Sequence, residues 1–150
     1  MSVQIEVGQK PKTARRNIPV YKVLKYDDTG VGGYEYYKYA RGAINKPIEE
    51  PRPGEVREFT DHNGIERHCI ELEQGYIYAY SKKKDAENLR QYLEDRAYYI
   101  DIKRPYYKTV TMYIPYGTEY YESIFNDLDS EIAARELYWP PEKKTKVNYV

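Results

Sequence analysis

Three tyrosines and three lysines that lie close together in the sequence are the first residues that could form a site. They are Tyr76, Tyr78, Tyr80, Lys82, Lys83 and Lys84. In a strand the alternating tyrosines would share one face, where aromatic rings can stack on bases or on a nucleotide. The lysines would follow at the start of a helix, where free backbone amides and ammonium groups attract an anion such as phosphate. The sequence therefore predicts either a nucleotide-binding surface or a packed tyrosine ladder beside solvated lysines.

Two groups of residues carry side chains that could bind a metal ion. The first group is His62, His68 and Cys69, and the second is Asp127, Asp129 and Glu131. The first matches no zinc spacing, and a strand would send His68 and Cys69 to opposite faces. The second lacks the ligand spacing and the glycine of a calcium-binding EF-hand loop. We therefore expect no metal site in either segment.

The composition indicates one ordinary domain that is rich in tyrosine. One hundred and fifty residues are enough for a single hydrophobic core. The 24 basic and 24 acidic side chains cancel, so no overall field favours nucleic acid or a membrane. Tyrosine occurs 20 times against 2 phenylalanines, and this excess suits interfaces and ligand grooves because each buried hydroxyl needs a hydrogen-bond partner. Tyrosine on solvent-facing sheet positions is the alternative explanation.

Several features of the sequence point to an intracellular protein. Cys69 is the only cysteine, which excludes an intrachain disulfide. No apolar run reaches the roughly 18 to 20 residues that span a bilayer. The first residues lack the apolar core of a signal peptide. We expect a cytoplasmic location without membrane contact, or a place in the virion if the protein is encoded by a phage.

Residues 1–17 are predicted to form a basic arm outside the core. The segment has little apolar periodicity and contains glycine and proline. Its basic residues are Lys10, Lys12, Arg15 and Arg16. An ordered polar arm of this kind would lie on another molecule, and we therefore predict that it forms an interface.

The remaining chain divides into a domain at residues 18–138 and a proline-rich, basic tail at residues 139–150. Strands are expected at 18–26, 56–60, 65–72, 76–80, 98–102 and 106–114 because apolar and polar residues alternate there. The second and third of these flank Asn63-Gly64, a common hairpin turn. Apolar residues at Ala86, Leu89 and Leu93 predict a helix over 82–96, with Ser81 as its N-cap. The predicted class is α+β, with a curved, mostly antiparallel sheet, one principal helix and extended arms at both ends.

The stretch from Gly75 to Glu131 resembles the C-terminal half of ADP-ribosyltransferase-like domains. Gly75-Tyr76-Ile77 opens a strand, Ala86 lies in the following helix, and the turn at residues 114–118, Ile-Pro-Tyr-Gly-Thr, resembles the family's aliphatic-Pro-x-Gly-Thr turn. Asp129-Ser130-Glu131 takes the place of the family's Glu-x-Glu segment. The same layout is similar to small uncharacterised proteins of gut bacteria and their phages.

The resemblance implies an NAD-binding scaffold in which Lys22, Tyr78 and Glu131 would hold the catalytic positions. Lys22 stands where the family has an arginine or histidine, and it lacks the fork of donors that arginine offers. Tyr78 and Tyr80 replace the family's Ser-Thr-Ser motif with phenolic hydroxyls. Glu131 retains the carboxylate that would stabilise an oxocarbenium-like transition state. This pattern favours a scaffold whose active site has degenerated, because fold alone does not fix function.

The expected function is a non-enzymatic binding or structural protein, encoded by a phage, that has no cofactor. Its tyrosine-rich sheet and charged arms would contact protein partners in a homo-oligomer or a larger assembly. The first alternative is an ADP-ribosyltransferase-like enzyme that uses NAD. The second is a small module that binds a nucleotide or nucleic acid through the tyrosines and lysines named first.

Overall fold

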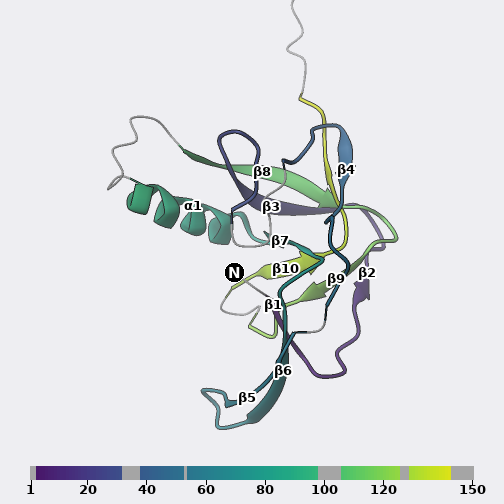
Figure 1. The fold of residues 1–150 in the computed structure, drawn as a ribbon, viewed down its shortest axis with the longest axis vertical. Coiled ribbons are helices and arrows are strands. Elements are labelled where there is room, and N and C mark those ends of the chain that lie inside the picture. Colours follow the sequence, from purple (N-terminus) through teal and green to yellow (C-terminus); the bar gives the residue numbers. More distant parts are fainter. Residues whose placement is uncertain (1–2, 32–37, 53, 98–105, 126–128, 143–150) are drawn as a thin grey trace, which may run out of the picture.

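The computed structural model describes residues 3–31, 38–52, 54–97, 106–125 and 129–142. Within them the chain forms two antiparallel sheets and the helix α1 (Figure 1). The strands are β1 (Val3–Glu6), β2 (Lys12–Thr13), β3 (Ile18–Lys25), β4 (Ala43–Asn45), β5 (Val56–Thr60), β6 (Glu66–Leu72), β7 (Ile77–Tyr80), β8 (Tyr107–Ile114), β9 (Glu119–Glu122), β10 (Glu131–Ala134) and β11 (Leu137–Trp139), and α1 spans Lys83–Ala97. The predicted α+β class with one principal helix is confirmed.

The larger sheet has the strand order β2-β9-β10-β7-β3-β8-β11-β4. Its longest pairing joins β3 to β8, from Ile18 opposite Ile114 to Lys25 opposite Tyr107. The apolar residues of β3 and β8 that point away from the helix meet β7, β10 and β11 in the main core, around Leu24, Met112 and Trp139. The strand predicted at residues 18–26 is therefore an internal one, as expected.

Helix α1 covers part of the opposite face of the larger sheet. Its stripe of Ala86, Leu89 and Leu93 packs against Val23 and Tyr80, which confirms the predicted apolar face. The helix begins at Lys83, so the cap position falls on Lys82 and the prediction of Ser81 as the cap is wrong.

A residue from a distant segment caps the helix instead. The backbone amide of Lys82 donates to Ser130 Oγ over 3.0 Å, and the amide of Ser130 donates to Asp85 Oδ2 over 3.1 Å. This reciprocal pair resembles a capping box, but its two halves lie 45 residues apart. It fixes the start of α1 to the segment that enters β10.

The N-terminal segment belongs to the fold, so the prediction that residues 1–17 lie outside the core is wrong. β1 pairs with β6, and Val3 is fully buried beside Leu72 and Tyr78. Ala14 is buried in the main core. The prediction failed because one short strand needs only two or three apolar residues when a partner strand supplies the remaining contacts.

The four basic residues assigned to this arm have different environments. Lys12 lies in β2, and its Nζ is 2.9 Å from Glu122 Oε2 of β9. Lys10, Arg15 and Arg16 are exposed. All four side chains therefore lie on the surface, with Lys12 paired to Glu122, but on a segment that the sheets hold in place.

The C-terminal boundary at residue 138 is also displaced. Trp139 closes β11 and is buried in the main core, with the Arg41 guanidinium 4.3 Å from the centre of its ring. The tail therefore starts one residue later than predicted. The large apolar ring of Trp139 packs in the core, and the strand ends only at the prolines that follow it. Residues 143–150 of that tail and the strand predicted at 98–102 lie outside the described residues.

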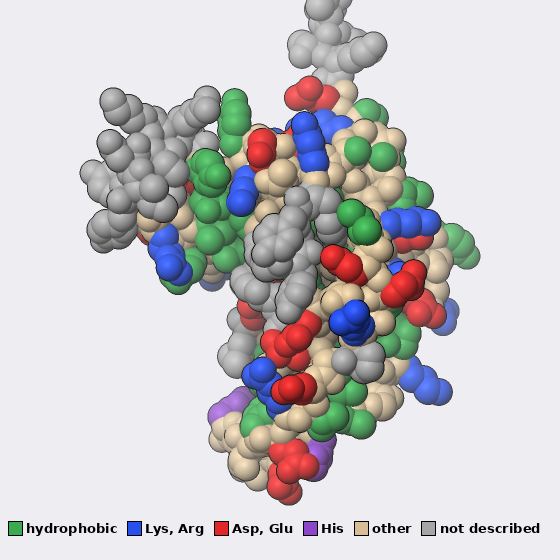
Figure 2. Space-filling view, in the orientation of Figure 1, with side chains coloured by type: hydrophobic (Ala, Val, Ile, Leu, Met, Phe, Trp, Pro, Cys, Tyr) green, Lys and Arg blue, Asp and Glu red, His purple; other side chains and the backbone are tan. Residues whose placement is uncertain are grey.

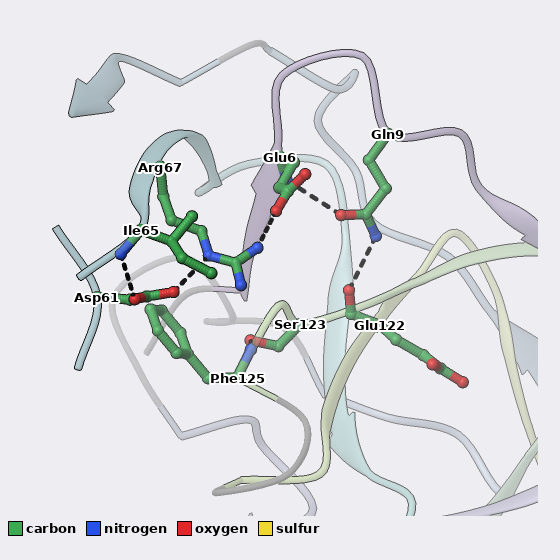
Figure 3. A network of polar contacts seen from close by, with 8 residues as sticks. All are labelled: Glu6, Gln9, Asp61, Ile65, Arg67, Glu122, Ser123 and Phe125. Atoms are coloured by element: carbon green, nitrogen blue, oxygen red, sulfur yellow. Dashed lines mark hydrogen bonds and ion pairs between the residues drawn. The ribbon is translucent and has the colours of Figure 1, made fainter. Parts of the chain in front are cut away.

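The predicted hairpin is present and joins β5 to β6. Asp61 organises its turn by accepting a hydrogen bond from the amide of Asn63 at 2.9 Å. It also accepts hydrogen bonds from the amide of Ile65 at 3.0 Å and from Arg67 Nε at 2.9 Å (Figure 3). The amide of Ile65 and the Arg67 side chain hold the pKa of Asp61 below its usual value. Arg67 also pairs with Glu6 of β1, so the turn is tied to the N-terminal strand.

The hairpin projects from the larger sheet and ends in a polar tip. Figure 1 shows β5 and β6 extending away from α1, and Figure 2 shows both histidines at this end of the molecule together with acidic side chains. Gln9 continues the connection towards the larger sheet, because its Nε2 donates to the backbone oxygen of Glu122 over 3.1 Å (Figure 3).

Candidate functional site

The three residues with implied catalytic positions lie on neighbouring strands. β10, β7 and β3 are consecutive in the larger sheet, with Glu131 opposite Tyr80 and Tyr80 opposite Tyr21. A small cavity lies between these strands and α1. Its lining is Lys22, Val23, Val31, Tyr78, Ala79, Tyr80, Leu89 and Glu131. The sheet therefore brings together residues that are more than 50 positions apart in the sequence.

Lys22 is a buried cation that is engaged by the protein itself. Only 2% of its surface is exposed, and Nζ donates to the backbone oxygen of Tyr78 over 2.7 Å. The same Nζ lies 5.2 Å from the centre of the Tyr39 ring. A carbonyl dipole and an aromatic face together compensate part of the cost of removing an ammonium group from water. In this arrangement Lys22 joins β3 to β7.

The cavity beside Lys22 and Glu131 is much smaller than a substrate. Its volume is about 20 Å³, which accommodates about one water molecule. Ordinary ligand pockets measure about 300 to 1,000 Å³. Glu131 itself is only 7% exposed. The positions that would face the ribose of NAD are therefore filled by the side chains of the protein.

The tyrosines of β7 do not form a surface for stacking bases. Tyr78 and Tyr80 are both buried, and the hydroxyl of Tyr78 donates to the backbone oxygen of Leu72. Burial raises the pKa of Tyr80, with a smaller contribution from the charge of Glu131. Tyr76 is half-buried and makes an edge contact with Tyr121 at 6.0 Å between ring centres. The prediction of an exposed stacking face is wrong, and the packed tyrosine ladder is what the structure contains.

The lysine run remains on the surface at the start of α1. Lys82, Lys83 and Lys84 are all exposed. The amide of Lys82 already donates to Ser130, and the carboxylate of Asp85 lies in the first turn. An anion at this position would meet three ammonium groups but also a neighbouring negative charge.

An open cleft of about 300 Å³ adjoins the small cavity. It lies between α1 and Asp129. Its lining is Tyr80, Asp85, Asn88, Leu89, Tyr92 and Asp129. Two carboxylates without a lining cation favour a positively charged group over a phosphate. The tyrosine rings would add cation–π contacts to such a group.

The two carboxylates of the cleft have pKa values shifted in opposite directions. Burial raises the pKa of Asp129, and the negative charge of Asp85 raises it further. Hydrogen bonds from Ser130 lower the pKa of Asp85. Asp129 Oδ1 is buried and has no hydrogen-bond partner among the described residues. Sequence reasoning did not predict this pair, because Asp85 comes from the helix and Asp129 from a loop 44 positions away.

A second concave surface lies at the other end of the larger sheet. It is a groove of about 390 Å³ with a mostly apolar lining. The lining residues are Asn17, Ile44, Tyr113, Pro115, Tyr138 and Pro140. Sequence reasoning missed this groove because four separate strands and the segments beside them contribute one or two residues each.

Cys69 and His68, two of the residues considered as metal ligands, have ordinary structural roles, and Asp127 lies outside the described residues. Cys69 is buried, and burial raises the pKa of its thiol. His68 is more exposed on the opposite face of β6, as strand alternation predicted, and its Nδ1 lies 3.2 Å from Glu58 Oε1. In the part of the chain that the structure describes, no three histidine, cysteine or acidic side chains are grouped as metal ligands.

Comparison of the chain with known protein families, with curated proteins and with solved structures found no match. Among the described residues, no helix has the length and apolar character needed to cross a bilayer.

Proposed function

We propose that this protein is a non-enzymatic binding protein that works in an assembly with protein partners. The observation that supports this most directly is the cavity between Lys22 and Glu131, which has room for about one water molecule. A transferase needs space in this cavity for the ribose of NAD, and the side chain that holds the ribose must be free to contact it. Here the cation of Lys22 is bound to the backbone of β7 instead.

The surfaces of the molecule also favour binding over catalysis. The apolar groove near Tyr113 and Tyr138 is open to solvent, and tyrosine is among the residues enriched at protein interfaces. The acidic cleft beside α1 disfavours the diphosphate of a dinucleotide. A protein partner needs neither a cofactor nor a deep pocket, so these features suit an intracellular assembly protein without a cofactor.

Thermal unfolding with and without NAD tests this proposal. A ligand that prefers the folded state must raise the melting temperature. We expect no change with NAD or ATP at about 1 mM, the upper end of ordinary Michaelis constants. A rise with NAD that disappears in Glu131→Gln would overturn the proposal in favour of the enzyme.

An ADP-ribosyltransferase-like enzyme is the second candidate, and one observation favours it. Lys22, Tyr78 and Glu131 come from three different strands and line the same cavity. For this function Lys22 must leave the Tyr78 carbonyl and the cavity must open. Release of nicotinamide from NAD by the wild-type protein, and its loss in Glu131→Gln, is the result that this candidate requires.

The nucleotide-binding alternative has less support. Burial of Tyr78 and Tyr80 removes the stacking surface on which it depended. Lys82, Lys83 and Lys84 remain exposed, so a weak contact with phosphate groups is what this alternative retains. Stabilisation by ATP that is lost in Lys83→Gln would support it.

A further inference from the structure

The turn of the β5–β6 hairpin holds an asparagine followed by a glycine. Asn63 and Gly64 are both exposed, and the hairpin projects from the larger sheet (Figure 1). An asparagine loses its side-chain amide when the backbone nitrogen of the next residue attacks Cγ and closes a five-membered ring, and asparagine is counted among the thermolabile residues. Glycine in the next position hinders this attack least, because it carries no side chain.

The surroundings of Asn63 leave its side chain open to this attack. Among the described residues, the hydrogen bonds of Asn63 involve only its backbone, whose amide donates to Asp61 Oδ1. A Cβ on Gly64 would meet nothing within 4 Å, so the space beside Asn63 Cγ is not crowded from that side. The exposure of Asn63 also brings its side chain into contact with the water that the second step of the reaction consumes.

The other described asparagines lack this combination of features. Asn45 is only 9% exposed, and its side chain is hydrogen-bonded to the backbone. Asn17 Oδ1 accepts a hydrogen bond from a backbone amide over 2.9 Å. Asn88 lies inside α1, where the next backbone nitrogen is held by the hydrogen bonds of the helix. Asn63 is therefore the described asparagine that is most open to the reaction.

The turn also restrains the attacking nitrogen. The amide of Gly64 donates to the backbone oxygen of Asp61 over 3.0 Å, and the carboxylate of Asp61 accepts from the amides on both sides, those of Asn63 and Ile65. The Gly64 nitrogen must leave its bond and give up its proton before it can attack. Asp61 opposes both events, because it keeps the turn closed and its negative charge disfavours a second negative charge nearby.

We propose that Asn63 is a site of spontaneous deamidation and that Asp61 controls its rate. The Gly64 nitrogen bonds to Asn63 Cγ, the Cγ–Nδ2 bond breaks, and the side-chain nitrogen leaves as ammonia with the proton that Gly64 gave up. Water then opens the succinimide ring at one of its two carbonyl carbons. Opening at Cγ gives aspartate, and opening at the main-chain carbonyl gives isoaspartate. One water molecule is consumed and one ammonia is released, without an oxidant or a reductant.

Both products change the hairpin. Each adds a negative charge beside Asp61, and isoaspartate also lengthens the backbone by one carbon atom before Gly64. The bonds that Asp61 accepts from the amides of Gly64 and Ile65 then no longer fit. Because Arg67 links Asp61 to Glu6, a wider turn loosens the hairpin from β1 (Figure 3). This chemistry is the same in a binding protein and in an enzyme, so it does not depend on the proposed function.

Peptide mapping of the aged full chain tests the proposal. Trypsin cleaves after Arg57 and Arg67, and Asn63 is the only asparagine or glutamine in the peptide 58–67. We expect this peptide to gain the mass of an amide-to-acid conversion before any other peptide does, in two forms of equal mass. The rate should rise with pH, since the Gly64 nitrogen must lose a proton. In Asn63→Gln the gain should disappear, because glutamine would have to close a larger ring.

Variants of two turn aspartates test the role of Asp61. Asp61→Ala should speed the reaction at least about fivefold, because the hydrogen bonds to a charged group that keep the turn closed are lost. Asp61→Ser keeps an oxygen that can accept from the amide of Asn63 and should speed it less. Asp27→Ala is the matched control, since Asp27 Oδ1 accepts from the amide of Thr29 over 3.2 Å in a different turn. It should leave the rate unchanged, and thermal unfolding checks that all variants fold.

Two results contradict the inference. If the peptide 58–67 keeps its mass throughout the incubation, or changes only after peptides with other asparagines, Asn63 is not the reactive site. If Asp61→Ala, Asp61→Ser and Asp27→Ala all deamidate at the wild-type rate, Asp61 does not control the reaction.

Discussion

The ammonium group of Lys22 donates a hydrogen bond to the backbone oxygen of Tyr78 over 2.7 Å, and this bond connects β3 to β7 inside the protein. A lysine in this position acts as a structural group between two strands. It also occupies the place where the transferase resemblance implies a residue that holds the ribose. The same contact therefore bears on stability and on the choice between binding and catalysis.

Replacing Lys22 by methionine tests its structural role. Methionine keeps the length of the apolar stem but removes the charged donor. We expect a loss of about 1 to 3 kcal/mol in the free energy of unfolding, the usual effect of losing a hydrogen bond from a buried charged group. Urea unfolding measures it. Lys10→Met is the control, because Lys10 is exposed, and an equal effect in both variants would contradict the assigned role.

Val3→Ala tests whether the N-terminal strand is part of the core. Val3 is fully buried against Leu72, so we expect a loss of about 2 kcal/mol in the free energy of unfolding. Val7→Ala is the matched control, since Val7 lies just beyond β1 and is exposed. If the N-terminal segment were an arm outside the core, the two variants would have the same urea midpoint as the wild type.

The acidic cleft predicts opposite effects for its two carboxylates. The pKa of Asp129 is raised in the folded state, so its ionisation opposes folding at pH 7 and Asp129→Asn should raise the melting temperature there. This gain should shrink as the pH falls towards the ordinary value of 3.8, where the carboxyl group becomes protonated in both states.

Asp85→Asn provides the comparison. The pKa of Asp85 is lowered in the folded state, so its negative charge stabilises the fold above about pH 4 and this contribution disappears as the pH falls below that value. The variant should therefore melt at a lower temperature than the wild type at pH 7. Two variants that shift the melting temperature in the same direction would contradict the assignment of the cleft.

Two glycines with the same backbone angle separate strain from steric contact. Gly75 and Gly117 have φ of 84° and 85°, where a side chain is unfavourable. A Cβ on Gly75 would lie 2.5 Å from the backbone of Pro51, whereas one on Gly117 meets nothing within 4 Å. We expect Gly117→Ala to lose about 1 to 2 kcal/mol from strain alone. Gly75→Ala should lose at least about 2 kcal/mol more, and equal losses in urea unfolding would contradict the close contact.

The parts of the fold with strong local patterns were predictable. The hairpin around Asp61, the strand β3 and the apolar stripe of α1 each depend on residues fewer than about 20 positions apart. The cap of α1 was not predictable in this way, because Ser130 reaches Lys82 from a distant loop. The burial of Val3 and Trp139 was not predictable either, because each becomes buried only when another strand pairs with the strand that contains it.

The sequence alone determined the α+β class, the positions of the helix and of five described strands (β3, β5, β6, β7 and β8), and the single cysteine that excludes an intrachain disulfide. Tertiary structure decided that Lys22 and Glu131 border one cavity, that this cavity has room for only about one water molecule, and that Tyr113 lies opposite Tyr138 beside an open groove. The physical reason is that local periodicity specifies which face of a strand is apolar. The order and register of the strands then decide which of those faces meet, and they depend on contacts between residues far apart in the chain.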